Sequence, residues 1–156
     1  MEKSDIYGPK GPLLSKGIRE LGALVLAFVL LYTGAGKLYD WEGTKAAFAN
    51  QVFPIWLSER LAWAVPTAEL AIAALLLFPT TRILGFKLAS GLFLLFTGYV
   101  ALVLTGIFGR IPCSCGGIVS TLGWWEHLVL NILLLVTAIL GYRLEKIGQS
   151  KINNEK

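Results

Sequence analysis

The sequence predicts an all-α fold: a four-helix transmembrane bundle with a short amphipathic surface helix in the first outer loop. Two observations lead to this prediction. Of the 156 residues, 55% are hydrophobic and only 15% are charged, whereas charged residues make up about 25% of an average soluble protein. The apolar residues also form four long tracts, and most charged residues lie in the chain ends and in the connections between tracts.

Each tract is close to the roughly 20 residues that an α-helix needs to cross a bilayer. The expected spans are residues 18–36, 61–78, 85–108 and 124–142. The first span resembles a signal peptide, but acidic residues in its leader and the lack of a clear cleavage site predict that it is retained. The expected transmembrane domain is therefore 17–142, with polar tails at 1–16 and 143–156.

The first loop contains a segment, 41–53, in which apolar residues lie among polar neighbours. Its apolar residues include Ala46, Ala47, Phe48 and Val52. Such a pattern is typical of a helix that lies on the membrane surface. Pro54 is expected to end this helix, since the residue before a proline disfavours helical geometry.

The distribution of Lys and Arg predicts the orientation. Ten of the 14 lie in the two tails, in the second loop or at their margins, and four lie in the first and third loops. Because Lys and Arg concentrate on the cytoplasmic side, both termini are expected in the cytoplasm and loops 37–60 and 109–123 outside. The basic residues flank apolar tracts and form no patch on a soluble domain, so the expected partner is the lipid bilayer and not nucleic acid.

The only two cysteines, Cys113 and Cys115, lie two residues apart after the third tract. The predicted orientation places them outside the cytoplasm, where disulfides persist. A disulfide between residues this close in sequence is strained, and strained, exposed disulfides are the labile ones. We therefore predict a redox-active pair. An unreactive structural pair, and a metal site formed by both cysteines with His127, are the alternatives.

His127 is the only histidine and is expected one turn into the fourth span, at the same membrane face as the cysteines. Its imidazole can serve as the base that forms an attacking thiolate, with packing at the membrane interface as the alternative. Glu126 is expected to stabilise the helix start if Gly123 is the N-cap.

Glu69 is an acidic residue inside an apolar tract, about 12 Å from the start of the second expected span at 1.5 Å per residue. A carboxylate within a bilayer is costly unless it is paired or protonated. Lys37, at the outer end of the first span, and Asn131, one turn after His127, are the expected partners. These residues are predicted to form either a polar clamp between helices or a substrate site for a proton or a quinone.

Several runs of residues carry a family resemblance. They are 32–40 (Tyr-Thr-Gly-Ala-Gly-Lys-Leu-Tyr-Asp), 63–70 (Trp-Ala-Val-Pro-Thr-Ala-Glu-Leu), 96–99 (Phe-Thr-Gly-Tyr) and 111–117 (Ile-Pro-Cys-Ser-Cys-Gly-Gly), followed by His127 and Asn131. Together they resemble the MauE/DoxX group of redox-associated membrane proteins over about residues 18–142. Lys37, Glu69 and the Cys-Ser-Cys-Gly-Gly run are the most specific parts.

The resemblance to MauE implies a multi-pass protein of the bacterial inner membrane that takes part in methylamine metabolism. Such a protein supports disulfide formation in an exported dehydrogenase subunit, beside an extracytoplasmic thioredoxin-like partner. The resemblance to DoxX implies a link to quinone chemistry, so quinone is the cofactor to consider. The Cys-x-x-Cys of other membrane thiol oxidoreductases is absent here. The first hypothesis is a thiol–disulfide redox protein, and its rivals are a non-enzymatic membrane scaffold and a metal-binding or transport protein.

Overall fold

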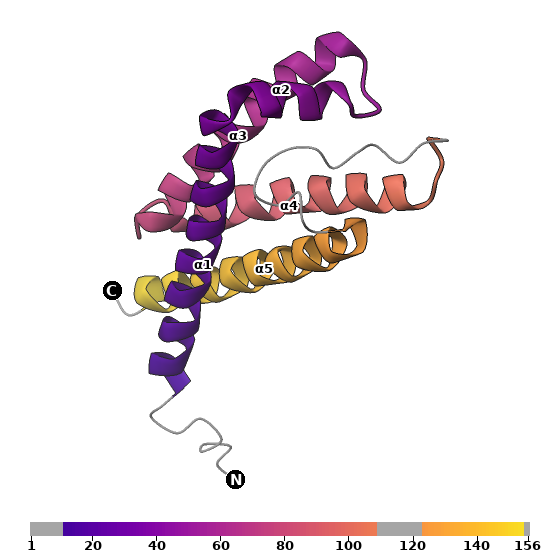
Figure 1. Cartoon of the computed structure of the whole chain (residues 1–156). Coiled ribbons are helices and arrows are strands. Elements are labelled where there is room, and N and C mark those ends of the chain that lie inside the picture. The colour runs from indigo at the N-terminus through magenta and orange to yellow at the C-terminus, as the bar shows by residue number, and fades with distance from the viewer. Residues whose placement is uncertain (1–10, 109–122, 155–156) are drawn as a thin grey trace.

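The computed structural model describes residues 11–108 and 123–154, and all regular secondary structure in these ranges is α-helical. The helices are α1 (Gly11–Tyr39), α2 (Trp41–Ala49), α3 (Ile55–Leu77), α4 (Arg82–Leu104) and α5 (Trp124–Asn154) (Figure 1). Four of them, α1, α3, α4 and α5, are long and apolar enough to cross a membrane. The predicted four-helix transmembrane bundle, with a short helix between the first two spans, is therefore confirmed.

The helices extend beyond the apolar tracts that identified them. Helix α3 begins at Ile55 and not near Leu61, so Glu69 lies fourteen residues into the helix, or roughly 21 Å at 1.5 Å per residue, instead of 12 Å. Helix α5 continues past Tyr142 to Asn154, so the described part of the expected C-terminal tail is helical. The polar turns at these helix ends remain helical because a helix satisfies its own backbone hydrogen bonds.

The surface helix ends earlier than expected. Helix α2 stops at Ala49, with Asn50 as its C-cap, and Pro54 is instead the N-cap of α3. The prediction that Pro54 ends the surface helix is therefore wrong. A proline has a fixed φ that suits the start of a helix, and its missing N–H costs nothing there.

The core is formed by one face of each spanning helix. These faces recur at intervals of three and four residues, as expected for a helix that is buried on one side. The buried core residues are Ala23, Leu26, Ala27 and Leu30 of α1, Ile72, Ala73 and Leu76 of α3, Phe86, Ala89 and Phe93 of α4, and Leu134 and Ala138 of α5. Phe86, one of the two phenylalanines among them, lies against Gly141 of α5, where a side chain would overlap the ring. α4 and α5 can therefore approach closely.

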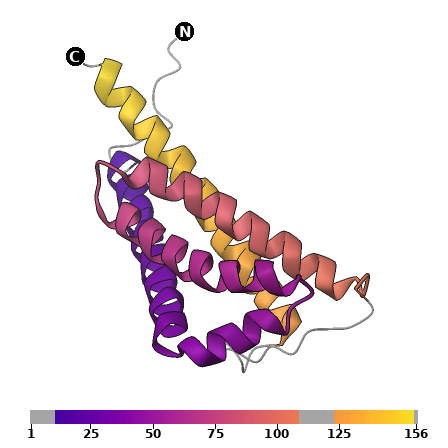
Figure 2. The same ribbon diagram turned by 90° about the horizontal axis from the view of Figure 1, so that it is seen from above.

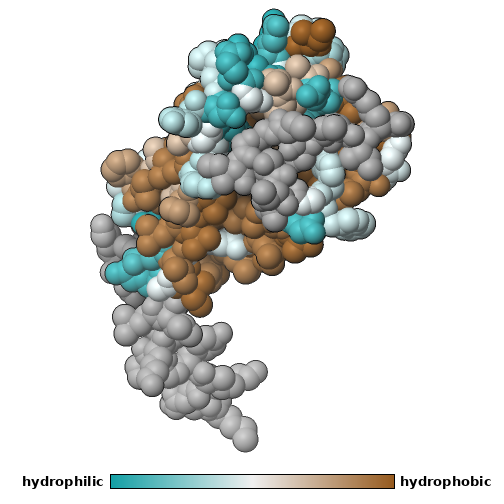
Figure 3. Space-filling view, viewed as in Figure 1, coloured by the Kyte–Doolittle hydropathy of each residue, from teal (hydrophilic) through white to brown (hydrophobic). Residues whose placement is uncertain are grey.

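The outward faces of the spanning helices are apolar too. Phe28, Leu95 and Leu133, for example, are 60% or more exposed. Figure 3 shows a broad apolar area on this face of the molecule, with most of the hydrophilic residues above it and a few at its lower edge. A soluble protein rarely exposes such a surface, and a lipid bilayer is the solvent that it fits.

The two ends of the bundle differ. Helix α2, the end of α1, the start of α3, the end of α4 and the start of α5 lie together at one end, which we call the α2 end (Figure 2). The start of α1 and the end of α5 lie at the opposite end, which we call the terminal end. Both described chain ends are therefore on the same side, as an even number of spans requires.

Candidate functional site

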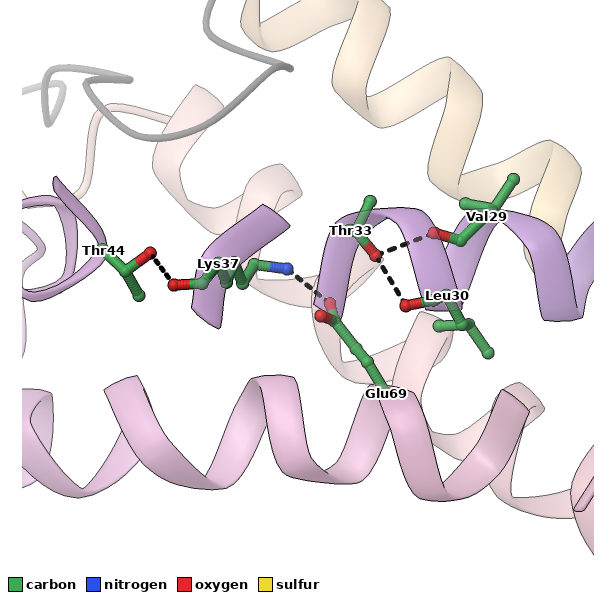
Figure 4. Close-up of polar contacts among 6 residues, drawn as sticks. All are labelled: Val29, Leu30, Thr33, Lys37, Thr44 and Glu69. Atoms are coloured by element: carbon green, nitrogen blue, oxygen red, sulfur yellow. Dashed lines mark hydrogen bonds and ion pairs between the residues drawn. The ribbon is translucent and has the colours of Figure 1, made fainter. Parts of the chain in front are cut away.

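An ion pair between two spanning helices is the centre of the candidate site. Lys37 lies in the last turn of α1, and Glu69 lies on the face of α3 that packs against α1. The Lys37 Nζ donates to Glu69 Oε1 at 2.5 Å (Figure 4). The Glu69 side chain is only 2% exposed and that of Lys37 is 28% exposed. The predicted approach of these two residues is thus confirmed, whereas their functional role stays a prediction.

Small and hydroxylated residues allow the pair to form. Gly34 lies one turn before Lys37, and a Cβ there would come within 3.2 Å of the Glu69 Cβ and of Leu70. Close contact between α1 and α3 therefore depends on the absence of a side chain. The hydroxyl of Thr33, which lies beside the carboxylate in Figure 4, donates to the Val29 carbonyl at 2.9 Å.

Helix α2 is attached to the same site. The hydroxyl of Thr44, which is buried, donates to the Lys37 carbonyl at 2.8 Å. Carbonyls in the last turn of a helix lack intrahelical donors, so Thr44 satisfies one of them. The first turn of α2 is held by Asp40, whose side chain accepts from the Gly43 N–H at 3.1 Å. These bonds connect the surface helix to the turn of α1 that carries the lysine.

One oxygen of the Glu69 carboxylate can accept a further hydrogen bond. Glu69 Oε2 is buried and has no hydrogen-bond partner among the residues that the structure describes. A buried polar atom without a partner is costly, and such atoms in native proteins call for an explanation, such as a water or a ligand. The arrangement is thus suited to accept a proton, or a hydrogen bond from an O–H or N–H group that reaches it.

The other predicted site residues have different positions. His127 and Asn131 lie on α5 and are half-buried, and Asn131 makes no hydrogen bond with the Glu69 carboxylate, whose Oε2 has no described partner. The structure thus shows no pairing of Asn131 with Glu69 among the described residues, and the role predicted for Asn131 in this site stays a prediction. Cys113 and Cys115 lie outside the described residues, so their predicted pairing with each other and with His127 stays a prediction.

The start of α5 agrees with the expectation that Glu126 stabilises the first turn of a helix that begins after Gly123. Gly123 directly precedes the helix, and the Glu126 carboxylate lies against Gly123. The backbone N–H of His127 donates to the Gly123 carbonyl at 3.1 Å. Glu126 therefore occupies the first turn, where a carboxylate interacts favourably with the positive end of the helix dipole.

Sequence reasoning missed a second ion pair between helices. Arg19 of α1 and Glu145 of α5 lie 3.4 Å apart at the terminal end, with side chains 19% and 10% exposed. The guanidinium passes over Gly148, where a side chain would overlap it. The opposite charges were visible in the sequence, but Glu145 was assigned to a tail outside the bundle. Only the continuation of α5 beyond Tyr142 brings it to Arg19.

A polar contact also joins the α2–α3 connection to α4. The hydroxyl of Tyr99 donates to Gln51 Oε1 at 2.5 Å, and the Tyr99 ring stacks on Phe53 with centroids 5.2 Å apart. Tyr99 lies five residues before the end of α4. No sequence pattern indicated this contact, because the partners are far apart along the chain and neither is charged.

The fold and the apolar surface define a multi-pass helical membrane protein with a charged pair buried between two of its spans. Comparison with protein families identifies the particular group. The family model described as "Methylamine utilisation protein MauE" matches residues 15–144, which include the first three spans, most of the fourth and the Lys37–Glu69 pair. The chain belongs to the MauE family. No curated protein and no solved structure matches it significantly.

Proposed function

We propose that this protein is a membrane thiol–disulfide redox protein that supports disulfide formation in exported proteins. The observation that carries the proposal is membership of the MauE family, in a chain whose only two cysteines follow one span and precede the next. The described residues that flank this segment, at the end of α4 and the start of α5, lie at the α2 end. We infer that this end faces outward and that both termini are cytoplasmic, because Lys and Arg favour the other side.

In the proposed reaction, a Cys113–Cys115 disulfide oxidises an extracytoplasmic thioredoxin-like protein. A partner thiolate attacks one sulfur and forms a mixed disulfide, and the second partner thiolate then displaces the remaining cysteine. The partner leaves as a disulfide and this chain keeps a dithiol. His127, at the start of α5, is proposed to hold or deliver the thiol protons. Two electrons and two protons must then leave to a membrane quinone, which becomes a quinol, or to another disulfide protein.

Lys37 and Glu69 are the proposed proton or quinone site of this cycle. The support is the buried carboxylate oxygen that has no described partner, next to a lysine that holds the other oxygen at 2.5 Å. Such a carboxylate can take up a proton released when the dithiol is oxidised and donate it to the reduced quinone. Ionisable groups inside a membrane span are functional in most proteins because they are costly to keep there.

A cysteine-trapping experiment tests the proposed function. Cys113→Ser and Cys115→Ser are expressed separately, with Ser114→Ala as the matched control between them. The single remaining thiolate can still attack an oxidised partner, and this chain then has no second cysteine to resolve the mixed disulfide, so one of the two variants is expected to accumulate a reducible mixed disulfide on a non-reducing gel. The control should show no adduct. If neither variant forms an adduct while wild type and both variants support the maturation of exported proteins equally, the redox role is wrong.

A non-enzymatic scaffold is the second candidate, and the interhelical ion pairs favour it. Lys37 with Glu69 and Arg19 with Glu145 each connect two helices, which is also what a polar clamp in a rigid scaffold requires. A scaffold retains its function when both cysteines are replaced by serine, whereas a redox protein loses it. The substrate pathway is a further proposal: the family description refers to methylamine utilisation, and growth of a deletion strain on methylamine tests it.

A further inference from the structure

A groove on the surface of α2 and α3 is separate from the ion pair. It has a volume of about 960 Å³ and is lined by side chains of these two helices only. Trp41 of α2 and Trp63 of α3 form one wall, with ring centroids 4.1 Å apart. Neither Lys37 nor Glu69 lines it, so the groove requires its own explanation.

One end of the groove is charged with both signs. Lys45, Glu59 and Arg60 line it there. Among the described residues, neither Glu59 nor Arg60 has an oppositely charged group within salt-bridge distance. Lys45 pairs with Glu42 at 2.8 Å, but both side chains are exposed, so this pair is weak and open to exchange. The end of the groove thus offers cations for a phosphate and a carboxylate for an ammonium group.

The floor of the groove is apolar and smooth. Ala64, Ala68 and Ala71 contribute only methyl groups. The hydroxyl of Thr67 donates to the Trp63 carbonyl at 2.7 Å, so its only hydrogen-bond donor is already used within the helix. A floor of this kind suits a hydrocarbon chain and offers nothing to a polar ligand.

The length of the groove indicates the class of ligand. Eleven residues separate Arg60 from Ala71, or roughly 16 Å at 1.5 Å per residue. This is about half of the roughly 30 Å of hydrocarbon in a bilayer. A partner's transmembrane helix would need the whole thickness, whereas one leaflet's lipid needs half, with its polar group at the charged end.

We propose that this groove binds one phosphatidylethanolamine molecule of the leaflet at the α2 end. Its phosphate pairs with Arg60 and Lys45, its primary ammonium pairs with Glu59, and one acyl chain lies along the alanine floor. The two tryptophans flank the glycerol region, at the depth that indole rings favour in membranes. The charge pattern selects this headgroup: phosphatidylglycerol has no ammonium group, and phosphatidylcholine has a quaternary nitrogen that cannot donate a hydrogen bond.

The test measures retained lipid on the purified full-length protein by native mass spectrometry. The protein is exposed to equal amounts of phosphatidylethanolamine, phosphatidylglycerol and phosphatidylcholine with identical acyl chains. Wild type is expected to retain phosphatidylethanolamine about tenfold better than the other two, the effect of one additional charge-assisted hydrogen bond. Glu59→Gln should lose this preference, and Arg60→Gln should weaken the retention of all three lipids.

Two further variants make the result specific to the groove. Ala64→Leu fills the floor and should abolish retention, while Lys146→Gln, at an exposed position on α5, should leave it unchanged. All four substituted residues are exposed, so an unchanged melting temperature shows that the fold is intact. Equal retention of the three lipids by wild type, or unaltered retention by Ala64→Leu, overturns the proposal. The proposal is also overturned if wild type holds a second copy of the protein in this groove, and Ala64→Leu displaces that copy and not a lipid.

Discussion

Removal of one partner of the Lys37–Glu69 pair is expected to have unequal effects. Lys37→Met leaves a carboxylate that is 2% exposed without its partner, and breaking a buried pair in this way costs about 3–5 kcal/mol of unfolding free energy. Glu69→Leu leaves Lys37, whose side chain is 28% exposed at the end of α1. A lysine in this position can extend toward water, so we expect a loss of about 1–3 kcal/mol.

The assay is denaturant unfolding in detergent micelles, applied to both single variants and to the double variant. Lys37→Met/Glu69→Leu should be more stable than Lys37→Met alone, because no charge is left unpaired. The exposed pair of Glu42 and Lys45 on α2 is the matched control, and its variants should change stability by no more than about 0.5 kcal/mol. Equal losses from the two single variants, or a double variant whose loss is the sum of both, would refute this reasoning.

Three further predictions follow from the fold. After mild reduction, Cys113 and Cys115 should react with a membrane-impermeant thiol reagent added from outside; labelling only after the cytoplasmic face is opened would reverse the orientation. Gly34→Leu should destabilise the bundle by about 1–3 kcal/mol through overpacking, whereas Gly91→Leu, where no atom lies within 4 Å of the added Cβ, should not; equal melting temperatures would contradict this. Arg19→Leu should lower stability by about 3–5 kcal/mol by leaving a buried carboxylate, and replacing that carboxylate as well should recover part of the loss, as measured by denaturant unfolding.

The spans and the Lys37–Glu69 pair could be predicted from the sequence because each rests on a strong energetic constraint. A bilayer requires long apolar helices, and an acidic residue inside one needs a partner within reach. Lys37 was the basic residue at the end of the neighbouring span. The same reasoning offered Asn131 as a further partner of Glu69, and no such contact is found among the described residues. A sequence gives the face of a residue on its own helix but not the rotation of that helix toward its neighbours.

The helix ends and the second ion pair could not be predicted for a related reason. Hydropathy marks where a chain is apolar, whereas a helix continues as long as its backbone bonds are satisfied. Ser58, Glu59 and Arg60 therefore belong to α3 although they are polar, and Glu145 belongs to α5. The Arg19–Glu145 contact depends on this continuation of α5. Gly148 leaves space for the guanidinium, and no sequence pattern indicates this.

The described polar contacts of the buried carboxylate do not directly reach the helices that flank the cysteine segment. Its partner lies on α1, while the helices that flank the cysteines are α4 and α5, which pack through apolar groups such as Phe86 on Gly141. The described polar side-chain contact that reaches α4 near its end is the bond from Tyr99 to Gln51. Gln51 follows α2, and α2 is bonded through Thr44 to the carbonyl of Lys37. The described polar contacts therefore connect the turn of α1 that carries Lys37 to the end of α4 through α2 and Gln51.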